Sequence, residues 1–207
     1  HLLSGGTYLA PAAVLYHAEA EWAGEAMPFE LPVKTLLRAQ LDCDVVPADA
    51  FRDGRARMDG KTLRIGTGGC RALVIPYAQR LPEFLLEAVL RAADEGLSVF
   101  FVDALPSGCP VETPRGAQLR ECLRKHSGVH VCACAELTGR LTELGLRVLR
   151  TAAPEPSLRM CRYRHEDCDV LFLTNEAPLE PVCTELTVQA EGYPVVYDAM
   201  ENAFCFP

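Results

Sequence analysis

A histidine, two glutamates and the single tryptophan lie close together near the start of this sequence: His17, Glu19, Glu21 and Trp22. Carboxylates and an imidazole can act as general acids, general bases or metal ligands. An exposed indole can stack on a sugar ring or anchor a protein contact. We take these four residues as candidates for ligand or domain-interface contact and assign no catalytic residue. The plainer alternative is a polar loop that packs against a neighbouring domain or subunit.

A second group of possible ligands is the pattern His-x3-His-x-Cys-x-Cys, formed by His126, His130, Cys132 and Cys134. This spacing is less diagnostic of zinc than paired Cys-x-x-Cys motifs, which form tight knuckles. Apolar residues alternate with the two cysteines, so both thiols are predicted on one side of a strand. We therefore predict structural thiols, no metal and no cofactor.

A cysteine hydrolase needs a strained strand-to-helix turn and a histidine partner for its nucleophile. Cys70 precedes a predicted strand, whereas Cys109 follows one but is succeeded by Pro110. Neither arrangement forms a regular nucleophile elbow. The glycine-rich run 66–69 matches no phosphate-binding motif and is predicted to be a loop.

Strand and helix patterns alternate through the first two thirds of the chain. Unbroken apolar runs predict buried strands, and leucine or alanine spacing predicts helices between them. The predicted strands are 12–16, 44–47, 72–76, 98–102 and 129–134, and the predicted helices are 28–40, 48–52, 82–95, 115–125 and 136–145. This order predicts a flavodoxin-like, doubly wound parallel sheet, the α/β architecture shared with class I glutamine amidotransferases.

Helical periodicity disappears near Pro154. Short strands are predicted at 158–164, 170–174, 186–189, 194–197 and 203–206, separated by turn residues. The sequence thus predicts an α/β domain over 1–153 and an antiparallel β segment over 154–207. Because the chain lacks an initial Met and ends directly after a strand, we expect it to be part of a longer protein.

Composition narrows the possible partners. The 207 residues include 28 acidic and 20 basic side chains, a formal net charge of −8. Three arginines between Arg159 and Arg164 are interpreted as a strand with one polar face, so no nucleic-acid or anionic-membrane surface is predicted. No apolar run is long enough to span a bilayer, and no signal peptide is evident. Ten cysteines scattered through apolar segments indicate reduced thiols and a cytoplasmic location.

Several segments resemble, in order, the middle domain of bacterial glycoside hydrolases, nearest to the family 42 β-galactosidase type. They are Ala13–Tyr16, Glu21–Ala23, Asp44–Val46, Ala72–Pro76 and Leu97–Phe101. The stretches 169–176 and 192–198 are similar to β-domains near the end of large glycoside hydrolases. The resemblance implies an amidotransferase-like domain without a nucleophile, which follows a catalytic TIM barrel and supports the oligomer.

The resemblance predicts a non-catalytic accessory or oligomerisation portion of an enzyme of carbohydrate metabolism. Its partners would be the barrel of the same polypeptide, other subunits, or both, with carbohydrate at the rim. The family's catalytic carboxylates belong to the barrel, and this chain is too short to contain one. The alternatives are a free-standing amidotransferase-like cysteine hydrolase and an interaction domain unrelated to sugars. For a doubly wound parallel sheet, we expect residues 17–22 at the carboxyl edge of the sheet, near the loop 105–110.

Overall fold

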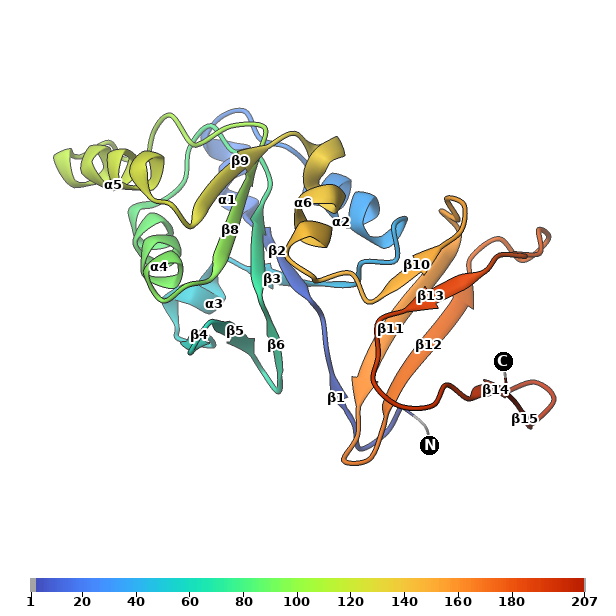
Figure 1. The fold of residues 1–207 in the computed structure, drawn as a ribbon. Coiled ribbons are helices and arrows are strands. Elements are labelled where there is room, and N and C mark those ends of the chain that lie inside the picture. The colour runs from blue at the N-terminus through green and yellow to red at the C-terminus, as the bar shows by residue number, and fades with distance from the viewer. Residues whose placement is uncertain (1–2, 207) are drawn as a thin grey trace.

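The computed structural model describes residues 3–206 and is built around a five-stranded parallel sheet (Figure 1). In chain order the strands are β2 (Ala12–Tyr16), β3 (Cys43–Pro47), β7 (Ala72–Ile75), β8 (Ser98–Val102) and β9 (Val129–Cys132). Their spatial order is β3-β2-β7-β8-β9, so the first parallel strand lies inside the sheet, the second at one edge, and the other three follow toward the opposite edge. This is the flavodoxin-like order, and the predicted fold class is confirmed.

Alternate side chains of the central strands enter two separate cores. Ala13 and Leu15 of β2 pack on one face of the sheet, and Ala12 and Val14 pack on the other. All four are fully buried, as expected for a strand covered on both sides. The apolar sequence of this strand therefore reflects two helical layers.

The helices form the two layers visible in Figure 1, with α4 and α5 on one side of the sheet and α2 and α6 on the other. The six helices are α1 (Ala18–Ala23), α2 (Glu30–Leu37), α3 (Asp49–Arg52), α4 (Glu83–Asp94), α5 (Pro114–Lys125) and α6 (Leu137–Glu143), with a 3-10 turn η1 (Cys134–Glu136). Thr113 caps α5 by accepting a hydrogen bond from the Gly116 amide, and Pro114 occupies the first turn. None of the described helices exceeds twelve residues, and none is long and apolar enough to cross a bilayer.

A small antiparallel sheet is inserted between β3 and β7. Its strands are β4 (Ala56–Asp59), β5 (Thr62–Ile65) and β6 (Gly68–Cys70). The prediction of a loop over 66–69 is therefore wrong for Gly68 and Gly69, which begin β6. A Cβ on Gly69 would lie 2.7 Å from the Thr62 side chain, so close strand packing explains this glycine.

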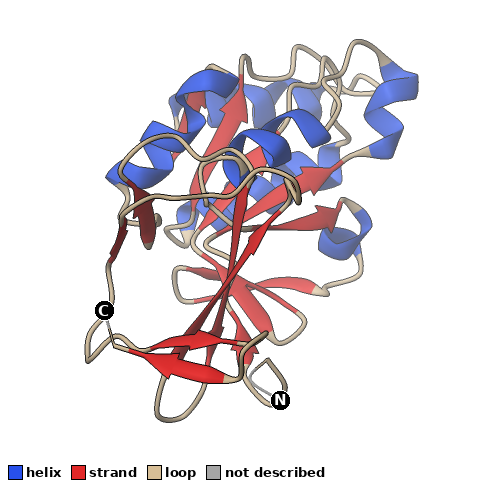
Figure 2. Ribbon diagram, turned by 90° about the vertical axis from the view of Figure 1, so that its right-hand side faces the viewer, coloured by secondary structure: helices blue, strands red, loops and turns tan. Residues whose placement is uncertain are grey.

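The final third is antiparallel, as predicted. The strands β11 (Leu158–Arg164) and β12 (Asp169–Asn175) form a long hairpin, and β1 (Thr7–Tyr8) from the start of the chain pairs with β11. Two further pairs join β10 (Leu149–Thr151) to β13 (Leu186–Val188) and β14 (Val196–Asp198) to β15 (Ala203–Cys205). Figure 2 shows these strands grouped apart from the helical layers.

Two buried polar groups join the β region to the parallel sheet. The Gln40 amide nitrogen Nε2 lies 2.8 Å from the Glu155 carbonyl oxygen and 3.1 Å from that of Leu158, at the start of β11. The Tyr8 hydroxyl donates to Asp42 Oδ2 at 2.7 Å. Burial raises the pKa of Asp42, and neighbouring Asp44 has its own pKa raised by burial and by Asp42. The junction is thus polar, desolvated and rich in carboxylates.

Candidate functional site

The carboxyl edge of the parallel sheet brings together the loops that follow β2, β7 and β8. These three strands are adjacent and parallel, so their following residues emerge on one side. This confirms the predicted position of residues 17–22 and of the loop 105–110 on the same edge. Ligands of open α/β sheets bind at this edge, although the edge alone defines no activity.

Gln79 connects the loops at this edge. Its amide donates to the Glu25 carbonyl at 2.7 Å, and its side-chain oxygen accepts from the Glu25 amide at 3.2 Å. The Gln79 carbonyl accepts from the amides of Ser107 and Gly108 at 3.0 and 3.1 Å. Backbone hydrogen bonds therefore hold the three loops as one surface.

His17 does not belong to the exposed part of this surface. Only 4% of the residue is accessible, and its Nε2 lies 3.1 Å from the Pro76 carbonyl oxygen. Because a carbonyl can only accept, Nε2 carries the hydrogen. Of the four candidates for ligand or domain-interface contact, His17 is the buried one, and its ring joins the end of β2 to the end of β7.

The other three candidates lie on α1, where a polar loop had been expected. Glu19 and Glu21 are exposed in the first turn, where acidic side chains favour the positive end of the helix dipole. Residues two positions apart on a helix do not face each other, so these carboxylates do not form a converging acid-base pair. Trp22 is 84% exposed. The geometry therefore provides an aromatic contact surface with acidic neighbours.

The histidine and cysteine pattern at 126–134 is dispersed by the fold. His126 Nδ1 accepts from the Gly128 amide, which leaves Nε2 to donate to Asp94 Oδ1 at 3.0 Å. His130 lies against the Phe100 ring, while Cys132 is buried beneath α6. Within residues 3–206, no group of three or more suitable side chains is arranged to hold a metal.

Cys109 is also unlike an activated nucleophile. Its thiol is buried and contacts the Arg120 guanidinium at 3.3 Å, and no histidine is among its hydrogen-bond partners in the described chain. Burial raises the pKa of this thiol, although Arg120 opposes the effect. A nucleophilic cysteine needs the opposite shift. The site therefore gives no support to the hydrolase alternative.

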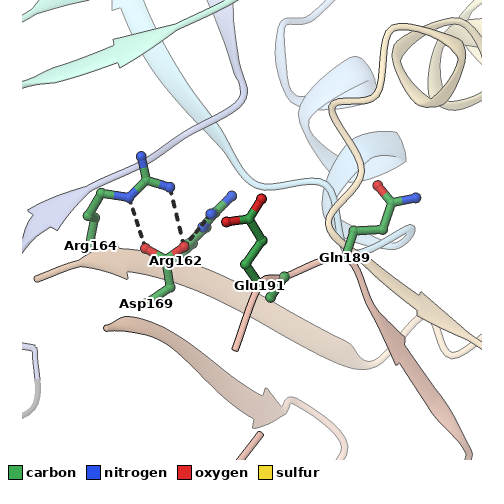
Figure 3. Close-up of a pocket in the computed structure, with 6 residues that line it drawn as sticks. Arg162, Arg164, Asp169, Gln189 and Glu191 are labelled. Atoms are coloured by element: carbon green, nitrogen blue, oxygen red, sulfur yellow. Dashed lines mark hydrogen bonds and ion pairs between the residues drawn. The ribbon is translucent and has the colours of Figure 1, made fainter. Parts of the chain in front are cut away.

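A separate polar cavity of about 630 Å³ lies at the far end of the β11–β12 hairpin (Figure 3). It is lined by Arg162, Arg164, Asp169, Gln189, Ala190 and Glu191. The sequence pattern did not predict this cavity, because all three arginines were expected on one polar face. Pairing shows instead that Arg162 and Arg164 share a face with Leu158 and Met160, while Arg159 lies on the other. The spacing of two between Arg162 and Arg164 is the signal that could have revealed it.

No protein-family model and no curated protein matches this sequence. Among solved structures, a rhamnosidase from Novosphingobium sp. PP1Y matches 84% of this chain with a TM-score of 0.62 and 14% identity. The exo-carrageenase GH42 from Bacteroides ovatus matches 90% with a TM-score of 0.53 and 10% identity. This chain covers 18% of the first protein and 25% of the second. The chain therefore has a fold that also occurs as a part of glycoside hydrolase chains.

Proposed function

We propose that this chain is a non-catalytic accessory portion of a glycoside hydrolase, with an α/β domain over 1–153 and a β segment over 154–207. Its proposed role is to pack beside a catalytic TIM barrel, support subunit contacts, or both. The observation that carries the proposal is Trp22, which is 84% exposed on α1, where the described carboxylates Glu19 and Glu21 form no converging pair. The likeness of fold to parts of two glycoside hydrolases supports it.

The surface around Trp22 suits a protein partner with a basic rim. Glu19, Glu21 and Glu25 are exposed on or beside α1, and a large aromatic side chain stands among them. Aromatic residues that enter a partner's pocket commonly dominate interface energies, while charges around them govern orientation and rate. Loops joined through Gln79 would hold the tryptophan without a large ordering cost.

The absence of catalysis is tested with the purified chain and a panel of nitrophenyl glycosides at high protein concentration. We expect no turnover, because two carboxyl groups must flank one glycosidic bond at about 5–10 Å. Activity that survives repurification and disappears in Glu19→Gln or Glu21→Gln would contradict the proposal.

The contact role is tested in the full natural polypeptide, whose reading frame should encode a neighbouring barrel with paired carboxylates. There, Trp22→Ala should weaken packing or oligomerisation by about 2 kcal/mol or more. In the isolated chain the same change should alter the unfolding free energy by less than about 0.5 kcal/mol, because the side chain is exposed. Leu144→Ala, another exposed apolar site, is the control. Equal effects of both substitutions on assembly, or a natural protein of only 207 residues, would refute the role.

A further inference from the structure

The cavity at the end of β11 and β12 has the size of a small-ligand site. Its volume of about 630 Å³ falls within the range of about 300–1,000 Å³ typical of ligand pockets. The β10–β13 pair covers the apolar part of the same sheet face, where Leu149 packs on Leu158 and Met160. Past the part covered by β10 and β13, this face of the hairpin carries Arg162, Arg164 and Asp169. The residues after β13 form the wall of the cavity that faces them.

The floor of the cavity is a fixed group of charges. Asp169 accepts from Arg164 Nε at 3.0 Å and also from the Arg162 guanidinium. Arg164, and then Arg162, hold the pKa of Asp169 at about 2, so it remains a carboxylate. Figure 3 shows Asp169 between the two arginines. These contacts occupy the Asp169 carboxylate and position the guanidinium of Arg162.

Arg162 retains an unused donor. Its Nε is buried and has no hydrogen-bond partner, the one such side-chain atom found within residues 3–206. A buried donor without an acceptor costs about 1–3 kcal/mol, so an acceptor that reached Nε after a shift of the Arg162 side chain would relieve an existing penalty. The opposite wall adds the amide of Gln189 and the carboxylate of Glu191, neither of which has a side-chain hydrogen bond or ion pair in the described chain.

The charges of the cavity decide the class of ligand. Two arginines balance Asp169 and Glu191, so the lining has no formal net charge and does not favour an anion or a cation. It instead offers donors and acceptors side by side. Hydroxyl groups both donate and accept, so neighbouring hydroxyls can satisfy a guanidinium and a carboxylate together. No aromatic side chain lines the cavity, so a ligand would be held through its polar edge.

We propose that this cavity binds a neutral saccharide, whose hydroxyls accept from Arg162 and donate to Glu191, with Gln189 as a further partner. The inference goes beyond the proposed accessory role and rests on this cavity alone. With few apolar contacts the expected affinity is weak, with a Kd of about 1–30 mM.

The test is a titration of the ¹⁵N-labelled chain, followed by NMR, with methyl α-L-rhamnopyranoside and methyl β-D-galactopyranoside. At least one glycoside should shift the Arg162 Nε–H signal and the amide signals of residues 189–191 in a saturable way. Glu191→Gln and Gln189→Ala should each weaken binding by about five-fold or more. Both residues are exposed, so the variants should fold normally. Glu185→Gln, at an exposed glutamate outside the cavity, should bind like the unchanged chain.

Three results would overturn the proposal. One is the absence of any shift at about 100 mM glycoside, well above the expected Kd. Another is a response to sodium sulfate but to neither glycoside, which would indicate an anion site. The third is a glycoside response confined to the Trp22 region, which would refute this cavity while leaving the proposed edge contact intact.

Discussion

Replacing Gln40 by alanine should loosen the junction between the parallel sheet and the β region. Gln40 is 1% exposed, and its amide nitrogen lies within hydrogen-bond distance of the carbonyls of Arg38, Glu155 and Leu158. An amide nitrogen has two hydrogens, so two of these carbonyls can be well satisfied at once. Gln40→Ala removes both bonds. The Glu155 carbonyl keeps the Leu158 amide at 3.1 Å and the Leu158 carbonyl keeps Arg159 Nη1 at 3.2 Å, so the loss is that of the Gln40 bonds themselves.

The expected loss of stability is about 1–3 kcal/mol, from two lost hydrogen bonds at about 0.5–1.5 kcal/mol each. Gln40 has a φ of 55°, but alanine bears the same left-handed strain, so the backbone contribution should cancel. Urea unfolding followed by circular dichroism at 222 nm measures the change. With a slope of about 2 kcal/mol/M, the midpoint should fall by about 0.5–1.5 M.

The matched control is Gln118→Ala, at an exposed position of α5. It should change stability by less than about 0.5 kcal/mol. Limited proteolysis adds a local measurement, because cleavage between residues 150 and 157 should accelerate only in Gln40→Ala. If the two variants unfold at the same urea concentration, the Gln40 contacts do not hold the junction.

Three further outcomes concern a buried carboxylate, two glycines of helices and the cysteine thiols. Burial raises the pKa of Asp42, so the folded chain binds this proton more tightly than the unfolded chain, and stability falls as the pH rises from the unfolded value of about 3.9 through the folded one. Asp42→Asn should reduce that decline when urea unfolding is repeated at increasing pH from about pH 4; parallel curves would contradict it. Gly116→Ala places a Cβ 2.8 Å from Cys109 Sγ and should cost about 1–3 kcal/mol in thermal or urea unfolding, whereas Gly139→Ala in open space should gain about 0.5–1 kcal/mol. Thiol titration of the denatured chain without reductant should find close to ten free thiols; a clear deficit would indicate disulfides.

The parallel sheet could be predicted because its signals are local. The Ala12–Tyr16 run is apolar throughout since both faces of β2 are covered, and the spacing in α4 directly reflects its one buried face. The pairing partners of the short strands were harder to predict from the sequence. The strand β1 has only two residues, and both its pairing with β11 and the contact of Tyr8 with Asp42 join residues far apart in the sequence.

The candidate site was only partly predictable for a related reason. Strand position placed residues 17–22 at the correct edge, but the burial of His17 depends on the Pro76 carbonyl, which a local pattern does not reveal. The faces of Arg162 and Arg164 depend on the strand register, and a shift of one residue would exchange them. Gln189 and Glu191 join the cavity through β13 and have no local motif at all.

The pairing of β1 with β11 has a consequence for how this chain acquires its structure during synthesis. Thr7 is made early, but its partner Arg164 follows only after all five parallel strands have been translated. The parallel sheet can therefore form while β1 is still unpaired. Pairing of β1 with β11 joins residues far apart in the sequence and is slow compared with local helix formation. Until β11 emerges, Asp42 lacks its contact with the Cys161 side chain. Desolvation of this carboxylate is thus completed only after the β region has been synthesised.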